Sequence, residues 1–195
     1  MRLVLASASP RRADLLRSAG IEFTVAPVAC DEAPHPGEHP IDYAERIARA
    51  KAELAAAEAG RAVVLAADTT VWISPEGGPI GKPVDRAQAA TILRALIAAQ
   101  PHRVTSAFAL LDRRGPAPRA VVRHTTTEVW MRPLDDAALD AHLDADEWRD
   151  KAGGYGIQGR AAGLVRRISG SYTAVVGLPL AEVLEALAAL DAAAP

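Results

Sequence analysis

Hydrophobic and polar positions follow two different periods along the chain, and each period predicts a different kind of element. Residues 62–67 form an unbroken apolar run, which predicts a buried strand that ends at Asp68. Residues 41–59 instead carry apolar side chains at three- and four-residue spacing, which predicts a helix closed by Gly60. The same criteria predict strands at residues 2–6, 22–27, 70–73, 103–111, 120–131 and 164–168, and helices at residues 10–19, 85–99, 135–144 and 179–190.

The order of these elements predicts the fold class. Strands and helices are mixed along the chain, and residues 103–111 and 120–131 are separated by a short turn that contains Gly115 and Pro116, so they are expected to form a hairpin. We therefore expect an α/β or α+β fold with a mixed central sheet flanked by helices. A length of 195 residues suits one domain over residues 1–195, or one domain with two lobes around a cleft.

Composition and charge narrow the classes of function. Half of the residues are hydrophobic, but only 4% are aromatic, so the core must be built mainly from Ala, Val, Leu and Ile. A net charge of -2, from 22 basic and 24 acidic residues, argues against a nucleic-acid-binding surface, which needs a basic excess. No apolar run reaches the roughly eighteen residues of a membrane helix, and the N-terminal run is too short for a signal peptide. These features predict a cytoplasmic protein that binds neither nucleic acid nor membrane.

Lysine is unusually scarce in this chain. Of its 22 basic residues only Lys51, Lys82 and Lys151 are lysines. Lys51 falls in line with Ile41, Ala44, Ile47 and Leu54 on the predicted helix, where a charge breaks the apolar stripe. Such breaks concentrate at functional sites, although a lysine that snorkels from the edge of the stripe is the alternative explanation.

Two further positions are candidates for binding anions or activating water. Ser7, Ser9, Arg11 and Arg12 surround a predicted helix N-terminus, where free N–H groups favour phosphate; an ordinary serine cap beside two solvated arginines is the alternative. Asp68 directly follows a buried strand, where open sheets place their ligands, and a turn-forming aspartate is the alternative there.

The glycine-rich segments carry weaker signals. Gly81-Lys82-Pro83 does not have the spacing of a phosphate-binding Walker loop. The loop at residues 153–159 contains four glycines, which would allow its backbone to approach a ligand closely.

Read together, these segments resemble the Maf family of nucleotide pyrophosphatases. The resemblance extends from residue 3 to about residue 187. The matching stretches occur in family order and are Leu5-Ala6-Ser7-Ala8-Ser9-Pro10-Arg11-Arg12, Asp31-Glu32, Ala50-Lys51-Ala52, Ala67-Asp68-Thr69, Gly81-Lys82-Pro83, His102-Arg103-Val104-Thr105, residues 150–159, Gly170-Ser171-Tyr172 and residues 176–180. Ala67 and Ser106 depart from it, because the family commonly has Gly at both positions.

The resemblance implies an elongated fold with a central cleft, similar to that of the inosine-triphosphate pyrophosphatases, and a cytoplasmic homodimer. It also implies hydrolysis of a nucleoside triphosphate to the monophosphate and pyrophosphate, with a divalent cation, Mg²⁺ or Mn²⁺, as cofactor. Asp68, Glu32 and Lys82 would be catalytic, and Asp68 and Glu32 would hold the metal. The substrate would be bound by Ser7, Ser9, Arg11, Arg12, Lys51, Thr69 and Gln158.

The branches of the family differ in the nucleobase of the substrate that they hydrolyse. The run Tyr155-Gly156-Ile157-Gln158-Gly159 resembles the branch that acts on dTTP and UTP, and a 7-methyl-GTP pyrophosphatase is the alternative. The family resemblance also suggests removal of non-standard nucleotides and a link to cell-division arrest. A non-catalytic nucleotide sensor in septum formation is therefore a third hypothesis.

Overall fold

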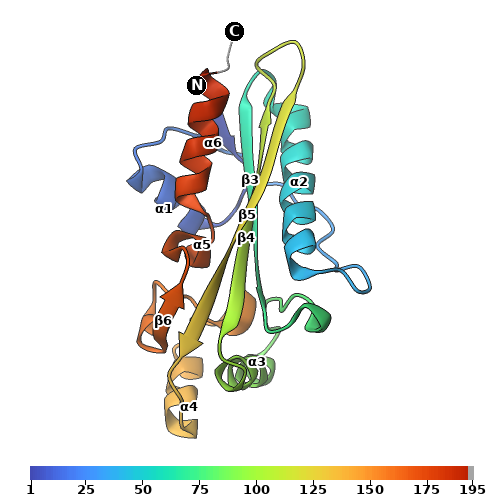
Figure 1. Cartoon of the computed structure of the whole chain (residues 1–195). Helices are drawn as coiled ribbons and strands as arrows, with labels where there is room; N and C mark the ends of the chain where they lie inside the picture. The colour runs from blue at the N-terminus through green and yellow to red at the C-terminus, as the bar shows by residue number, and fades with distance from the viewer. Residues whose placement is uncertain (193–195) are drawn as a thin grey trace.

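The computed structural model describes residues 1–192, and a single six-stranded sheet forms its centre (Figure 1). The strands lie in the order β2-β1-β3-β4-β5-β6. β1 is parallel to β2 and to β3, whereas all later neighbours are antiparallel, so the predicted mixed sheet is confirmed. The bounds of the strands are Leu3–Leu5 for β1, Thr24–Val25 for β2, Val63–Trp72 for β3, His102–Asp112 for β4, Arg119–Met131 for β5 and Val165–Ser169 for β6.

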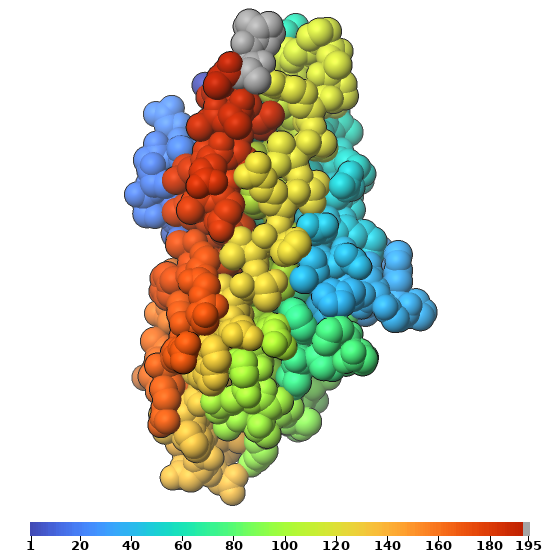
Figure 2. All heavy atoms as spheres, viewed as in Figure 1, coloured from blue at the N-terminus to red at the C-terminus, as the bar shows by residue number. Residues whose placement is uncertain are grey.

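Helices cover both faces of the long central strands. In Figure 1, α2 lies on one side of β3, β4 and β5, while α1, α5 and α6 lie on the other and α3 and α4 at one end. Figure 2 shows that the molecule is elongated, as predicted. The bounds of the helices are Pro10–Ser18 for α1, Pro40–Ala59 for α2, Arg86–Ala98 for α3, Asp136–Asp144 for α4, Tyr172–Val176 for α5 and Leu180–Ala192 for α6.

The two faces of the sheet are packed with side chains of different size. Alternate residues of a strand point to opposite faces. Val64 and Ala66 of β3 therefore meet the buried alanines of α2, such as Ala48 and Ala52, so that this helix can lie close to the sheet. Leu65 lies on the other face, in the larger side chains of the cluster that contains α1 and α6. The abundant alanine of the sequence thus replaces larger side chains in the core on this one face of the sheet.

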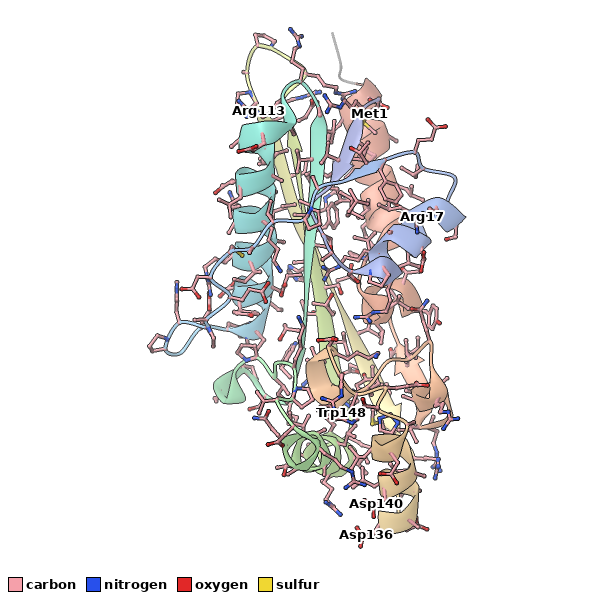
Figure 3. The ribbon with its side chains drawn as sticks, turned by 180° about the vertical axis from the view of Figure 1, so that it is seen from behind. Met1, Arg17, Arg113, Asp136, Asp140 and Trp148 are labelled. Atoms are coloured by element: carbon pink, nitrogen blue, oxygen red, sulfur yellow. The ribbon has the colours of Figure 1, made fainter. Side chains whose placement is uncertain are left out.

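A third apolar cluster fills the far end of the molecule. It joins the ends of β3, β4 and β5 to α3 and α4, with Trp148 and Tyr155 among its members. Trp148 and the α4 residues Asp136 and Asp140 are labelled at this end in Figure 3, whereas Met1 and Arg113 lie at the opposite end. The single sheet extends from one end of the molecule to the other, and the cavity described below lies between the two ends. The division into one domain with two lobes remains a prediction.

Several sequence-based boundaries were wrong. The strands predicted at residues 62–67 and 70–73 are one strand, β3, so Asp68 lies within a strand and pairs with Ala107 instead of following the strand. Thr69 and Thr70 favour the extended conformation, which lets the strand continue through the aspartate. Leu54 is 47% exposed and does not belong to the buried face of α2. The short helix α5 was not predicted.

The helix termini mostly follow the predicted signals. Asp85 and Asp135 accept hydrogen bonds from Gln88 N and Ala138 N and thereby cap α3 and α4. Ser9 precedes α1 as predicted, but its side chain makes no capping hydrogen bond. Within residues 1–192, no helix is long and apolar enough to span a membrane.

Candidate active site

The candidate site opens where β1 ends beside the much longer strand β3. Ala6 N donates the last sheet hydrogen bond to Leu65 O, after which the chain turns away into α1. The edge of β3 beyond Leu65 is therefore left without β1 as a neighbour, and a cavity of about 750 Å³ lies there. It is lined by all ten residues predicted from the sequence, namely Ser7, Ser9, Arg11, Arg12, Glu32, Lys51, Asp68, Thr69, Lys82 and Gln158.

Lys51 and two carboxylates form a charged cluster in the wall of this cavity. Lys51 Nζ lies 2.9 Å from Asp68 Oδ1 and 2.6 Å from Glu32 Oε1. Asp68 and Lys51 are only 7% and 9% exposed, whereas the Glu32 side chain is 45% exposed. The lysine that interrupts the helix stripe therefore faces the site, which excludes the snorkelling alternative.

The environment shifts these three groups in different directions. Burial raises the pKa of Asp68, although Lys51 and Arg12 oppose the shift. Burial also acts against the charge on Lys51, but Asp68 and Glu32 outweigh it and raise the pKa of the ammonium. Burial would raise the pKa of Glu32, but the hydrogen bond from Lys51 and the positive charges of Lys51, Lys82 and Arg12 together lower it. The site thus holds a basic carboxylate beside a firmly charged ammonium, as in sites where groups with separated pKa values act as acid and base.

Arg12 ties three segments of the cavity wall together. Its Nε donates to Gly177 O at 2.8 Å, its Nη1 to Ser7 Oγ at 3.0 Å and its Nη2 to Thr69 Oγ1 at 3.1 Å. A guanidinium has five N–H groups, so part of its capacity remains for an anion in the cavity. Burial lowers the pKa of Arg12, and the charge of Asp68 opposes this shift.

Thr69 also contacts a residue that departs from the family pattern. Its Oγ1 lies 2.7 Å from Ser106 Oγ, and Ser106 in turn donates to Ala174 O at 2.6 Å. The serine at a position where Gly is expected adds a buried hydroxyl behind Thr69 and fixes Thr69 against α5.

The other predicted residues lie around the rim of the cavity. Ser9 and Arg11 are half-buried at the start of α1, while Lys82 and Gln158 are exposed. Gln158 follows the buried Tyr155 and Ile157 in the glycine-rich loop. These side chains surround the opening through which a ligand would enter.

The cavity is also lined by polar residues that the sequence did not predict as site residues, among them Tyr43 and Lys151. Tyr43 lines the cavity, and its hydroxyl donates to Glu32 O at 3.0 Å, which fixes the loop that carries this carboxylate. Lys151 also lines the cavity, with Nζ bonded to Glu147 O. The scarcity of lysine marked Lys151 as unusual, but no residue pattern assigned it a role.

The donor set fits a divalent cation bound together with a phosphate ligand. Mg²⁺ is commonly held by one or two carboxylates plus substrate oxygens and water, and Asp68 and Glu32 supply two carboxylates 2.9 and 2.6 Å from the same ammonium. Among residues 1–192 there is no group of three or more His, Cys, Asp and Glu that could hold an ion alone. The protein would therefore need the substrate to complete the coordination.

Comparisons with known proteins agree with this geometry. A family model described as Maf-like protein matches residues 2–190. A dTTP/UTP pyrophosphatase from Geobacter sp. (strain M21) is 46% identical over 97% of this chain and 96% of its own length. A dTTP/UTP pyrophosphatase from Geobacter sulfurreducens is 47% identical over 98% and 97%. The solved structure of a HAM1 protein from Coxiella burnetii covers 97% of this chain and 99% of its own with a TM-score of 0.52; at 18% identity it supports the fold alone.

Proposed function

Because the chain belongs to the Maf family, we propose that it is a nucleoside triphosphate pyrophosphatase that hydrolyses dTTP and UTP to the monophosphate and pyrophosphate. The observation that carries the proposal is the cavity in which Asp68, Lys51 and Glu32 are in contact below a rim of cationic and hydroxyl side chains. Such a cavity combines a carboxylate that can accept a proton with several groups that can neutralise phosphates. The named activity of the relatives supports the same conclusion.

In this proposal Asp68 acts as the general base. A water molecule attacks the α-phosphorus, its proton passes to the Asp68 carboxylate, and the bond from the α-phosphorus to the bridging oxygen breaks as pyrophosphate leaves. A base works best when its pKa lies near the operating pH, so the raised pKa of Asp68 favours this role. Lys51 holds Asp68 Oδ1 in place and keeps a positive charge beside the reacting phosphate.

The triphosphate is bound by the groups at the start of α1 and by Lys82. Arg11 and Arg12, with Ser7 and Ser9, present donors to the phosphate oxygens, and Lys82 adds a further cation from the same cavity. A divalent cation, Mg²⁺ or Mn²⁺, held by Asp68 and Glu32 would supply charge neutralisation and a more acidic water. The cationic side chains then stabilise the charge that develops on the leaving pyrophosphate.

The base is recognised at the glycine-rich loop. The exposed amide of Gln158 has both a donor and acceptors for the uracil edge, and the neighbouring glycines let the backbone approach the ring. Thr69 and Arg11 belong to the same wall and complete the specificity set. We also propose that the protein is a cytoplasmic homodimer; sedimentation of the purified chain tests its assembly.

A nucleotide panel tests the proposed function. Purified protein is given dTTP, UTP, CTP, GTP and 7-methyl-GTP with Mg²⁺ or Mn²⁺, and pyrophosphate release is measured through inorganic pyrophosphatase. We expect dTTP and UTP to be the best of these substrates. A preference for 7-methyl-GTP would support the other branch, and binding without hydrolysis of any nucleotide would support the sensor hypothesis.

A further inference from the structure

Two buried histidines bond to the glycine-rich loop from the core beneath it. His102, the first residue of β4, has Nε2 2.8 Å from the Tyr155 hydroxyl. His142 of α4 donates from Nε2 to Gly154 O at 3.2 Å. His102, His142 and Tyr155 are 0%, 5% and 6% exposed, so both hydrogen bonds are shielded from water. Polar groups are costly to bury unless they are paired, and each of these imidazoles uses a nitrogen to hold the same loop.

The pairing of His102 with Tyr155 is a contact between neutral groups. Burial lowers the pKa of His102 to about 4, against a smaller opposing effect from the backbone of Leu96, and burial raises the pKa of Tyr155. Both side chains are therefore uncharged at neutral pH. Their rings also meet edge to face, with centroids 5.5 Å apart. The hydrogen bond and the ring contact thus fix the relative orientation of the two side chains. Because neither side chain is charged, the strength of this contact should not depend on salt concentration.

The backbone of the loop is fitted closely to the same core. Gly153 has φ +73°, and a Cβ at this position would lie 3.1 Å from Val71. Its N–H donates to Gly81 O at 3.2 Å, next to Lys82 on the cavity rim. A Cβ on Gly156 would lie 2.7 Å from Lys151 Cε. The loop therefore has little freedom to shift while Tyr155 remains in place.

Gln158 lies three residues after Tyr155 and depends on this anchor. Ile157 between them is buried in the apolar cluster on the other side of the cavity. On the far side of Gln158, Glu147 Oε2 accepts a hydrogen bond from Arg160 N at 2.8 Å. The exposed amide is thus presented by a short segment fixed at both ends, and Tyr155 is the end that bonds to the sheet.

We propose that His102 and Tyr155 are positioning residues for nucleotide selection, because their buried hydrogen bond fixes the loop that presents Gln158 to the base. This inference rests on the proposed function. It assigns the pair no part in the proton transfer, which the proposed function places at Asp68. Loss of the hydrogen bond should therefore weaken selection among bases while the chemical step continues.

Tyr155→Phe is the sharpest test, because it removes one oxygen atom and keeps the ring. We measure kcat and KM for UTP, dTTP, CTP and GTP. The ratio of kcat/KM for UTP over that for CTP should fall about fivefold, the equivalent of one net hydrogen bond, through a higher KM for UTP. The kcat for UTP should stay within about twofold. Tyr172→Phe, the same change at a side chain that is 46% exposed, should leave the ratio unchanged.

Substitutions of His102 separate positioning from packing. His102→Leu removes the polar partner, whereas His102→Gln keeps a group that can bond to the tyrosine hydroxyl. We expect His102→Gln to recover most of the selectivity that His102→Leu loses. An unchanged ratio in folded Tyr155→Phe would overturn the proposal, and so would an equal fall in kcat for every nucleotide.

Binding measurements distinguish failure of this inference from failure of the proposed function. Calorimetric titration of UTP and CTP into Asp68→Asn, with and without Tyr155→Phe, measures selection where turnover is suppressed. If the parent protein hydrolyses neither UTP nor dTTP, the proposed function fails. The positioning role is then judged by the UTP-to-CTP ratio of Kd values, which Tyr155→Phe should raise about fivefold and which an inert contact would leave unchanged.

Discussion

Lys51 Nζ lies 2.9 Å from Asp68 Oδ1, although the two residues are 17 positions apart in the sequence and belong to different elements, α2 and β3. The ammonium also contacts Glu32, which comes from a loop, so one lysine connects three separate segments. A buried charge is expensive unless it is paired, and this arrangement pairs one cation with two anions. The excess negative charge of the cluster is suited to a divalent cation, and the surrounding arginines are suited to phosphates.

Substitution of Asp68 tests the general base. Asp68→Asn keeps the size of the side chain and removes its charge, so kcat should fall by roughly 10²- to 10⁴-fold, the usual contribution of general-base catalysis. Turnover of dTTP and melting of the variant are measured together. Asp14→Asn, at an exposed residue paired with Arg17, is the matched control and should be neutral. Near-normal turnover by a cooperatively folded Asp68→Asn would remove Asp68 from the mechanism.

The opposite pKa shifts of the two carboxyls predict opposite effects on stability. The folded state raises the pKa of Asp68, so its contribution to stability is present at low pH and is lost as pH rises through that pKa. Asp68→Asn should therefore melt at the same or a higher temperature than the parent at pH 7. The folded state lowers the pKa of Glu32, so its contribution is present above the unfolded pKa and lost as pH falls through the folded one.

Thermal melting against pH measures both effects. Glu32→Gln should lower the melting temperature at pH 7, and the difference should disappear as pH falls through the lowered pKa of Glu32. The effect should be small, because the Glu32 side chain is 45% exposed. A large loss of stability in Asp68→Asn at pH 7 would show that the contact with Lys51 outweighs the cost of burying the carboxylate.

The residues singled out in the sequence all line one cavity, whereas the shape of the sheet around them was not predicted. Local signals, such as the apolar runs and the helical spacing of apolar side chains, placed nearly every helix and strand. They could not show that β3 continues through Asp68, because an aspartate beside two threonines is compatible with either a strand or a turn. Space for a cavity beside Asp68 is left by the early end of β1, a relation between two strands about sixty residues apart in sequence.

The roles of residues that act through others could not be predicted either. Lys51 was visible because a charge interrupts an apolar stripe, but Arg12 was indistinguishable from a solvated arginine until its contacts with Ser7, Thr69 and Gly177 were known. Tyr43 gave no signal at all, because its hydroxyl bonds to the backbone carbonyl of Glu32 in the loop before α2, and a backbone acceptor leaves no pattern in the sequence. Such partners depend on tertiary packing, which a single sequence does not specify.

Exchange of lysine for arginine tests why this arginine-rich chain keeps its lysines. Lys51→Arg should lower kcat/KM at least about tenfold, because a planar guanidinium cannot replace a compact ammonium that contacts Asp68 and Glu32 at 2.9 and 2.6 Å. Lys82→Arg should also lower activity, but less, because the exposed side chain can adjust. Arg17→Lys on the surface is the control. If both substitutions had equally negligible effects on activity, codon usage would explain why lysine stands at positions 51 and 82.

Removal of divalent cations tests the metal requirement. Treatment with a chelator should abolish turnover, and added Mg²⁺ or Mn²⁺ should restore it. Glu32→Gln should raise the metal concentration that gives half-maximal activity, because one of two carboxylates has lost its charge. Full activity in the chelator would contradict the assignment of Asp68 and Glu32 as metal ligands.

Truncation of Gln158 tests how the base is read. The amide offers a donor and acceptors that match the imide and carbonyl groups of uracil, and its exposed position on the rim leaves it free to meet a ligand. Gln158→Ala should reduce discrimination between UTP and other nucleotides by about 1–3 kcal/mol, the cost of an unpaired polar partner in the closed complex. The rate at saturating UTP should change little, because the reacting phosphorus lies beside Asp68. Competition between UTP and CTP at equal concentration gives the ratio of kcat/KM directly, and an unchanged ratio would remove Gln158 from base recognition while leaving the pyrophosphatase proposal intact.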